Sequence, residues 1–124
     1  MTHQEVEKLN ILVLSFVGDS VFSLYVRKKL AEGELCKIEA MHKKASEIVS
    51  AGGQSKFVEI LESKFTEAEK SVYMRARNCK NHAQPKSFSV AEYRRATGFE
   101  AVLGWLYLLG ESARIDELLL VLEF

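Results

Sequence analysis

Two acidic residues stand alone in strongly apolar stretches, and they are the first candidates for chemistry. Asp19 is the only charged residue in the segment 11–26, and Glu100 is the only one in the segment 97–109. An ionised carboxylate among apolar side chains costs free energy unless a partner compensates it. Each acid therefore predicts a partner that its own segment does not supply.

Small residues accompany both acids, with Gly18 and Ser20 beside Asp19 and Gly98 close to Glu100. Glycine lets two backbones approach closely, or leaves room for a ligand. The simplest arrangement is a crossing of the two segments that turns both acids toward one cation. Oxygen donors without a nearby His or Cys favour Mg²⁺, with Mn²⁺ as a substitute, over zinc. The alternative left open is that each acid pairs with a buried Arg or caps a neighbouring helix.

Positive charge is concentrated in one part of a chain whose formal net charge is zero, with 17 Lys and Arg and 17 Asp and Glu. Residues 70–95 contain seven Lys and Arg and one acid, Glu92, which gives this segment a net charge of +6. Such a segment, interleaved with aromatic residues, suits contact with phosphates, and a solvated loop is the alternative. The candidate RNA contacts are Arg75, Arg77, Asn78, Lys80, Lys86, Arg94 and Arg95, together with Lys43 and Lys44 from a second, smaller basic cluster.

The elements that must position these residues are predicted to be helices. The chain has one proline, Pro85, and long stretches of good helix formers. Capping boxes at 66–69 and 89–92 predict two helix starts, and Gly52–Gly53 predicts a break. We expect helices over residues 4–8, 9–31, 37–50, 56–63, 66–77, 89–109 and 112–122, and an exposed loop over 78–88. With no repeat and no long linker, residues 1–124 are expected to form a single all-α domain.

Several classes of protein are excluded. Two cysteines, Cys36 and Cys79, are too few and too far apart for a disulfide framework or a zinc knuckle. The first residues do not resemble a signal peptide, and the apolar segment 11–26 is shorter than the roughly 20 residues of a membrane span. We therefore expect a cytoplasmic protein without a membrane partner. A hard-metal carboxylate pair combined with a basic segment points to phosphodiester chemistry on a nucleic acid.

Two motifs make this expectation more specific. Residues 14–22, LSFVGDSVF, resemble the signature of the ribonuclease III family, and residues 97–104, TGFEAVLG, resemble its second motif. Further similarity at residues 41–46, 75–78 and 93–95, with no sequence left for a double-stranded-RNA-binding domain, is typical of the bacterial Mini-ribonuclease III subgroup.

This resemblance implies an all-helical endonuclease domain that forms a homodimer and cuts RNA duplexes with Mg²⁺, leaving 5′-phosphates. Asp19 and Glu100 match the catalytic, metal-binding acids of the family. The signature helices would pack around the two-fold axis, with Phe16, Phe22 and Val26 as candidate interface residues. The subgroup trims both ends of precursor 23S ribosomal RNA, which implies that RNA as substrate and makes a ribosomal protein a candidate partner.

The sequence departs from the family pattern at three acidic positions, which are Leu12, Ser15 and Thr97 here. We therefore expect one firmly bound Mg²⁺ per site. The alternative is a catalytically weak or inactive RNA-binding scaffold on the same fold. Retention of two costly acids in apolar helices favours the enzyme. No role is assigned to Cys79, His82 or Tyr25.

Overall fold

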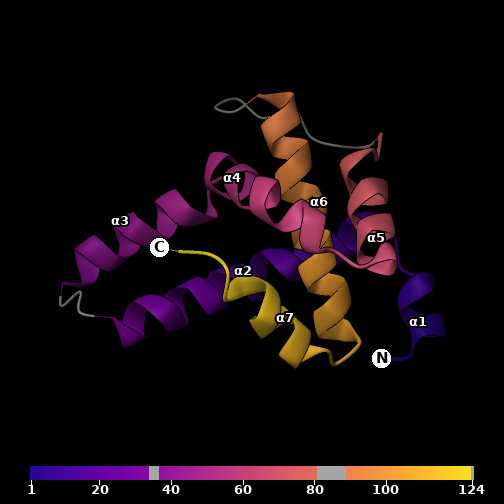
Figure 1. Cartoon of the computed structure of the whole chain (residues 1–124), viewed down its shortest axis with the longest axis horizontal. Coiled ribbons are helices and arrows are strands. Elements are labelled where there is room, and N and C mark those ends of the chain that lie inside the picture. Colours follow the sequence, from indigo (N-terminus) through magenta and orange to yellow (C-terminus); the bar gives the residue numbers. More distant parts are fainter. Residues whose placement is uncertain (34–36, 81–88, 124) are drawn as a thin grey trace.

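The computed structural model describes residues 1–33, 37–80 and 89–123, and within these ranges it consists of helices without strands (Figure 1). The predicted all-α class is confirmed. The elements in chain order are α1 (His3–Glu7), α2 (Ile11–Glu32), α3 (Ile38–Val49), α4 (Ala51–Leu61), a 3₁₀ helix η1 (Glu62–Lys64), α5 (Glu67–Arg77), α6 (Val90–Leu108) and α7 (Ser112–Leu119). Lys86 and His82, both in the predicted loop, lie outside the described residues. None of the described helices is long and apolar enough to cross a membrane.

Side-chain caps set several helix starts, as the sequence predicts. The Thr66 hydroxyl accepts a hydrogen bond from the Glu69 N–H (3.2 Å), and the Glu69 carboxylate accepts one from the Thr66 N–H (2.9 Å), so this capping box is complete. At α6 only half of the predicted box forms. Ser89 Oγ accepts from the Glu92 N–H (3.1 Å), but the Glu92 carboxylate accepts from the Ser89 hydroxyl instead of the backbone.

The break between α3 and α4 lies at Ser50, so the prediction of a break at Gly52–Gly53 is wrong. Ser50 is extended (φ −60°, ψ 157°), and its hydroxyl accepts from the Gly53 N–H (3.1 Å) as the N-cap of α4. Both glycines lie inside the first turn of α4. A Cβ on Gly53 would lie 2.5 Å from the Ile48 carbonyl oxygen, so glycine permits the tight junction instead of breaking the helix.

Helix α6 is the centre of the fold, with α2, α4 and α5 packed against it (Figure 1). The Phe22 ring meets the Phe99 ring edge-on at 5.0 Å between centroids. Phe22 and Val26 are only 1% and 0% exposed within a single chain, so their prediction as dimer interface residues is wrong. Their side chains fill the core of the protomer itself and offer nothing to a partner. Phe16, in contrast, is 78% exposed.

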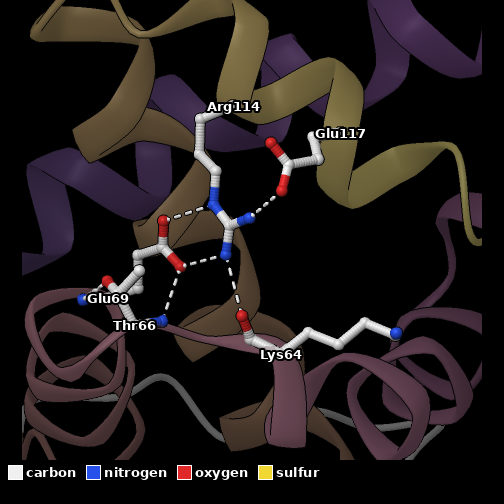
Figure 2. Close-up of polar contacts among 5 residues, drawn as sticks. All are labelled: Lys64, Thr66, Glu69, Arg114 and Glu117. Atoms are coloured by element: carbon white, nitrogen blue, oxygen red, sulfur yellow. Dashed lines mark hydrogen bonds and ion pairs between the residues drawn. The ribbon is translucent and has the colours of Figure 1, made fainter.

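An ion pair fastens α7 to the start of α5 (Figure 2). Arg114 donates from Nε and Nη2 to the two carboxylate oxygens of Glu69, each at 2.8 Å. The same guanidinium donates to the Lys64 carbonyl oxygen (2.8 Å) and to Glu117 (2.7 Å). The sequence predicted Glu69 as a capping residue but did not reveal its second role or the part played by Arg114.

Candidate active site

The site is built at a crossing where the backbones of α2 and α6 touch. A Cβ built on Gly18 would overlap the carbonyl oxygen of Glu100, and one on Gly104 would overlap the carbonyl oxygen of Leu14. No side chain fits at either position, so two glycines determine where the helices cross. The predicted close approach at Gly18 is confirmed, whereas the matching role of Gly104 was not predicted.

Two further residues fix the register of this crossing. The buried Ser15 hydroxyl donates to the Thr97 carbonyl oxygen at 2.9 Å, joining residues that are 82 positions apart. Thr97 in turn donates from its hydroxyl to the Tyr93 carbonyl oxygen at 3.0 Å. Ser15 and Thr97 stand where the family pattern has acids, and here they contribute to helix packing.

The crossing brings the two lone acids into contact. The carboxyl groups of Asp19 and Glu100 are hydrogen-bonded to each other, with Asp19 exposed and Glu100 half-buried. Burial, followed by the hydrogen bond and the negative charge of Asp19, raises the pKa of Glu100 to about 9. Without a bound cation, Glu100 therefore holds a proton near neutral pH and shares it with Asp19. The partner that each isolated acid required is the other acid.

A third side chain, Gln54 from α4, reaches the same place. It is 3% exposed, and its amide lies near the Glu100 carboxyl group, where it opposes the rise in the Glu100 pKa. Nothing in the local sequence distinguishes this glutamine from a surface residue, so sequence reasoning did not identify it. Only the packing of α4 on α6 places it beside the acids.

The donor set at the crossing consists of oxygen atoms and is suited to a hard cation. Asp19 and Glu100 can each supply a carboxylate. Within the described ranges, no group of three or more His, Cys, Asp or Glu residues could enclose a metal ion. Mg²⁺ commonly binds through one or two carboxylates and keeps several water ligands, so the residues present fit this ion.

Several predicted RNA contacts surround a hollow at the end of α5. A cavity of about 450 Å³ is lined by Tyr73, Arg77, Asn78, Arg94 and Arg95, with Glu62 and Ala91. The Arg77 guanidinium lies 5.7 Å from the centre of the Tyr73 ring. Cations and one aromatic face thus converge on a concave surface.

The cations of this hollow differ in how firmly they are held. Arg94 donates from Nη1 to the carbonyl oxygens of Arg77 (3.2 Å) and Cys79 (3.1 Å), so it fastens α6 to the end of α5. Arg95 lies 3.7 Å from exposed Glu59 and is itself half-buried in this ion pair. Arg94 is therefore an anchor for the segment, whereas Arg95 can exchange its partner for another anion.

The remaining predicted contacts are not all at this hollow. Arg75 and Lys80 are exposed near the end of α5, and Lys43 and Lys44 are exposed on α3.

The structure also defines the surroundings of Tyr25 and Cys79, two residues to which the sequence assigned no role. Burial and the nearby carboxylate of Asp116 in α7 raise the pKa of Tyr25, and Cys79 is a half-buried free thiol.

Comparison with known proteins agrees with this fold and site. The Ribonuclease III domain family matches residues 12–111. The chain is 40% identical over 119 residues to Mini-ribonuclease 3 of Thermoanaerobacter sp. (strain X514), covering 96% of the chain and 84% of that protein. It is 36% identical over 119 residues to Mini-ribonuclease 3 of Clostridium tetani, covering 95% and 79%.

A solved structure shows the same arrangement of helices. The crystal structure of a Fusobacterium nucleatum protein superimposes with a TM-score of 0.84 at 29% identity, covering 94% of this chain and 93% of the other. The motifs, the helical fold and the matched relatives agree over nearly the whole chain. The chain therefore belongs to the ribonuclease III family of endoribonucleases and resembles the Mini-ribonuclease 3 proteins within it.

Proposed function

We propose that this protein is a Mg²⁺-dependent endoribonuclease that cleaves double-stranded RNA at the pair Asp19 and Glu100. The observation that carries this proposal is the α2–α6 crossing, which sets an exposed acid against a half-buried one in an otherwise apolar contact. The names of the Mini-ribonuclease 3 relatives support the substrate class.

The two acids would hold one Mg²⁺ in different ways. Asp19 is the exposed ligand, open toward the substrate, and Glu100 is the ligand fixed by the packing of α6. Glu100 must release its proton for the ion to bind, so binding is coupled to pH. When bound, Mg²⁺ would activate water and stabilise charge at the scissile phosphate. The chain's own contribution is to fix the spacing of the two carboxylates through Gly18 and Gly104.

The basic residues would bind the RNA backbone. Arg77 and Arg95 line the hollow, and Arg75 and Lys80 extend it with exposed cations. Arg95 is five residues before Glu100, which is about 8 Å along a helix axis. Contacts to phosphates read the shape of a duplex, and A-form RNA hides its base edges from side chains. Replacing Arg75 and Arg77 with Ala is expected to weaken duplex binding and flatten its salt dependence, and unchanged binding would contradict this assignment.

We also propose that the protein acts as a homodimer. Phe16 and Leu24 are 78% and 63% exposed, and they lie on one face of α2, next to Asp19 and Ser20. Exposed apolar side chains gathered in this way mark an interaction surface. F16E is expected to yield monomers in sedimentation and to lose cleavage, and a monomer with full activity would refute the dimer.

The natural substrate is proposed to be precursor 23S ribosomal RNA, trimmed at both ends in the cytoplasm with the assistance of a ribosomal protein. The resemblance to the Mini-ribonuclease III subgroup supports this choice. The basic hollow is compatible with any RNA duplex and does not select among them.

Cleavage of a long RNA duplex by the purified protein with Mg²⁺ tests the proposed activity. Loss of cutting in D19N and after addition of EDTA, with 5′-phosphates on the products, is the expected result. Persistent cutting by D19N would remove Asp19 from the site. Tight, salt-sensitive binding without cutting, even on precursor 23S RNA with ribosomal proteins present, would favour the scaffold alternative.

A further inference from the structure

Gln54 is the buried polar residue at the acid pair to which neither the family motifs nor the sequence pattern assigns a task. It lies in α4 just after the Ser50 junction, and it is 3% exposed. A glutamine is rarely buried unless its amide group is fully hydrogen-bonded. The side chain is therefore held in the interior by specific partners, and its partners show what it does.

The orientation of the amide group follows from one of those partners. Gln54 Nε2 donates to the Val49 carbonyl oxygen at 2.8 Å. A carbonyl oxygen only accepts hydrogen bonds, so the nitrogen end of the amide must face Val49. The second hydrogen of Nε2 remains available, and the amide lies near the Glu100 carboxyl group. The side chain is thus anchored to the end of α3 and lies beside Glu100.

The other end of the amide is the unexplained part. Gln54 Oε1 is the one buried side-chain nitrogen or oxygen without a hydrogen-bond partner among the residues that the structure describes. A flipped amide would not resolve this, because it would turn Oε1 toward the Val49 carbonyl. An orphaned buried acceptor costs free energy, and here it belongs to the amide group that lies near Glu100. The unpartnered oxygen is therefore part of the side chain beside the acid pair.

We propose that Gln54 is a positioning residue of the acid pair, and that its buried Oε1 is a neutral oxygen donor toward the cation or its hydration shell. This inference rests on the proposed function, because it assumes a cation at Asp19 and Glu100. It accounts for the missing partner of Oε1. It also compensates in part for Ser15 and Thr97, which supply no carboxylate to the site. The junction at Ser50 and Gly53 serves to deliver this side chain.

Direct Mn²⁺ binding without RNA, measured by electron paramagnetic resonance of the free ion, tests the proposal independently of cleavage. Q54M keeps the length of the side chain and removes both polar ends, and it is expected to weaken Mn²⁺ binding about tenfold. Q54E retains an oxygen donor and is expected to bind Mn²⁺ at least as tightly as the unmodified protein. S55A, which removes a neighbouring buried hydroxyl on α4, is the matched control and is expected to change nothing.

D19N separates this inference from the proposed function. If D19N loses Mn²⁺ binding while folded Q54M retains it in full, the role of Gln54 is overturned and the acid pair stands. If both variants bind Mn²⁺ normally, the acid pair is not the cation site and both proposals fall.

A measurement on the unmodified protein covers the case in which Q54M does not fold. The sequence contains three glutamines, Gln4, Gln54 and Gln84, so their side-chain amide signals can be assigned by nuclear magnetic resonance. Saturating Mg²⁺ is expected to shift the Gln54 signals and leave those of exposed Gln4 in place. Gln54 signals that stay unmoved at saturation would overturn the proposal.

Discussion

Two glutamates of this protein share a buried or half-buried setting and differ in the partner that each one meets. Glu69 faces the guanidinium of Arg114, and Glu100 faces the carboxyl group of Asp19. Burial alone would raise the pKa of both. For Glu69, hydrogen bonds from Arg114 and from the Thr66 backbone, with the positive charge of Arg114, outweigh burial and lower its pKa. For Glu100, a second acid adds to burial, and the pKa rises to about 9.

The difference is the one expected between a structural site and the proposed cation site. The Glu69 cluster is internally complete, because both carboxylate oxygens have donors and the arginine has three acceptor residues. The Glu100 cluster has surplus negative charge and an unpartnered Gln54 oxygen. A complete cluster stabilises the fold, whereas an incomplete one favours the binding of a cation. Replacing the glutamate with glutamine should therefore lower stability in the Glu69 cluster, whereas in the Glu100 cluster it should lower RNA cleavage without lowering stability.

Removing the charge of Glu100 should have the largest effect on function. E100Q is expected to reduce cleavage of an RNA duplex by about a thousandfold, because one carboxylate ligand is lost. Its thermal stability without divalent ions should equal or exceed that of the unmodified protein at pH 8, since folding no longer has to protonate a carboxylate that is ionised in the unfolded chain. Cleavage assays and thermal melts on the same sample check this, and near-normal cleavage would refute the assignment.

The same substitution at Glu69 should act on stability instead. E69Q leaves the Arg114 guanidinium without its bidentate partner and is expected to cost about 3 kcal/mol in the free energy of unfolding. For a chain of this length, that corresponds to a fall of about 10 °C in Tm. Cleavage per folded molecule at low temperature should persist. A Tm equal to that of the unmodified protein would show that the ion pair contributes nothing net.

The two glutamates should change the free energy of unfolding with pH in opposite directions. Between pH 4.5 and about 9, Glu100 binds its proton in the folded state and loses it when unfolded, so stability without divalent ions falls as pH rises. The steepest slope expected is about 1.4 kcal/mol per pH unit, and E100Q should abolish it. Glu69 contributes stability above pH 4.5 that is lost as pH falls through its lowered pKa. Denaturant titrations across pH measure both, and an unchanged slope in E100Q would contradict the raised pKa.

The smallest expected effect isolates the geometry of the Arg114 contacts. R114K keeps the positive charge but cannot donate to both Glu69 oxygens, Lys64 and Glu117 together. We expect a loss of about 1 kcal/mol, well below that of E69Q, with cleavage unaffected. A loss as large as that of E69Q would show that hydrogen-bond geometry, and not charge, stabilises this junction.

Much of the local structure could be predicted from the sequence. The Thr66–Glu69 capping box, the helix ending before Gly110 and the charge concentrated at 70–95 depend on neighbouring residues, and local rules describe them. The isolation of Asp19 and Glu100 in apolar segments also predicted that they would need a partner. Small residues beside them predicted the close approach of α2 and α6.

Other features were decided only by the tertiary structure. Apolar residues lie all around α2, so its pattern could not distinguish core-facing Phe22 and Val26 from exposed Phe16. The contact of Arg114 with Glu69 spans 45 positions, and that of Ser15 with Thr97 spans 82. Gln54 reaches Glu100 only because α4 packs on α6. The sequence determined which residues need partners, and packing between distant helices determined which partners they have. The reason is that burial and hydrogen bonding depend on contacts between helix surfaces, and not only on neighbours along the chain.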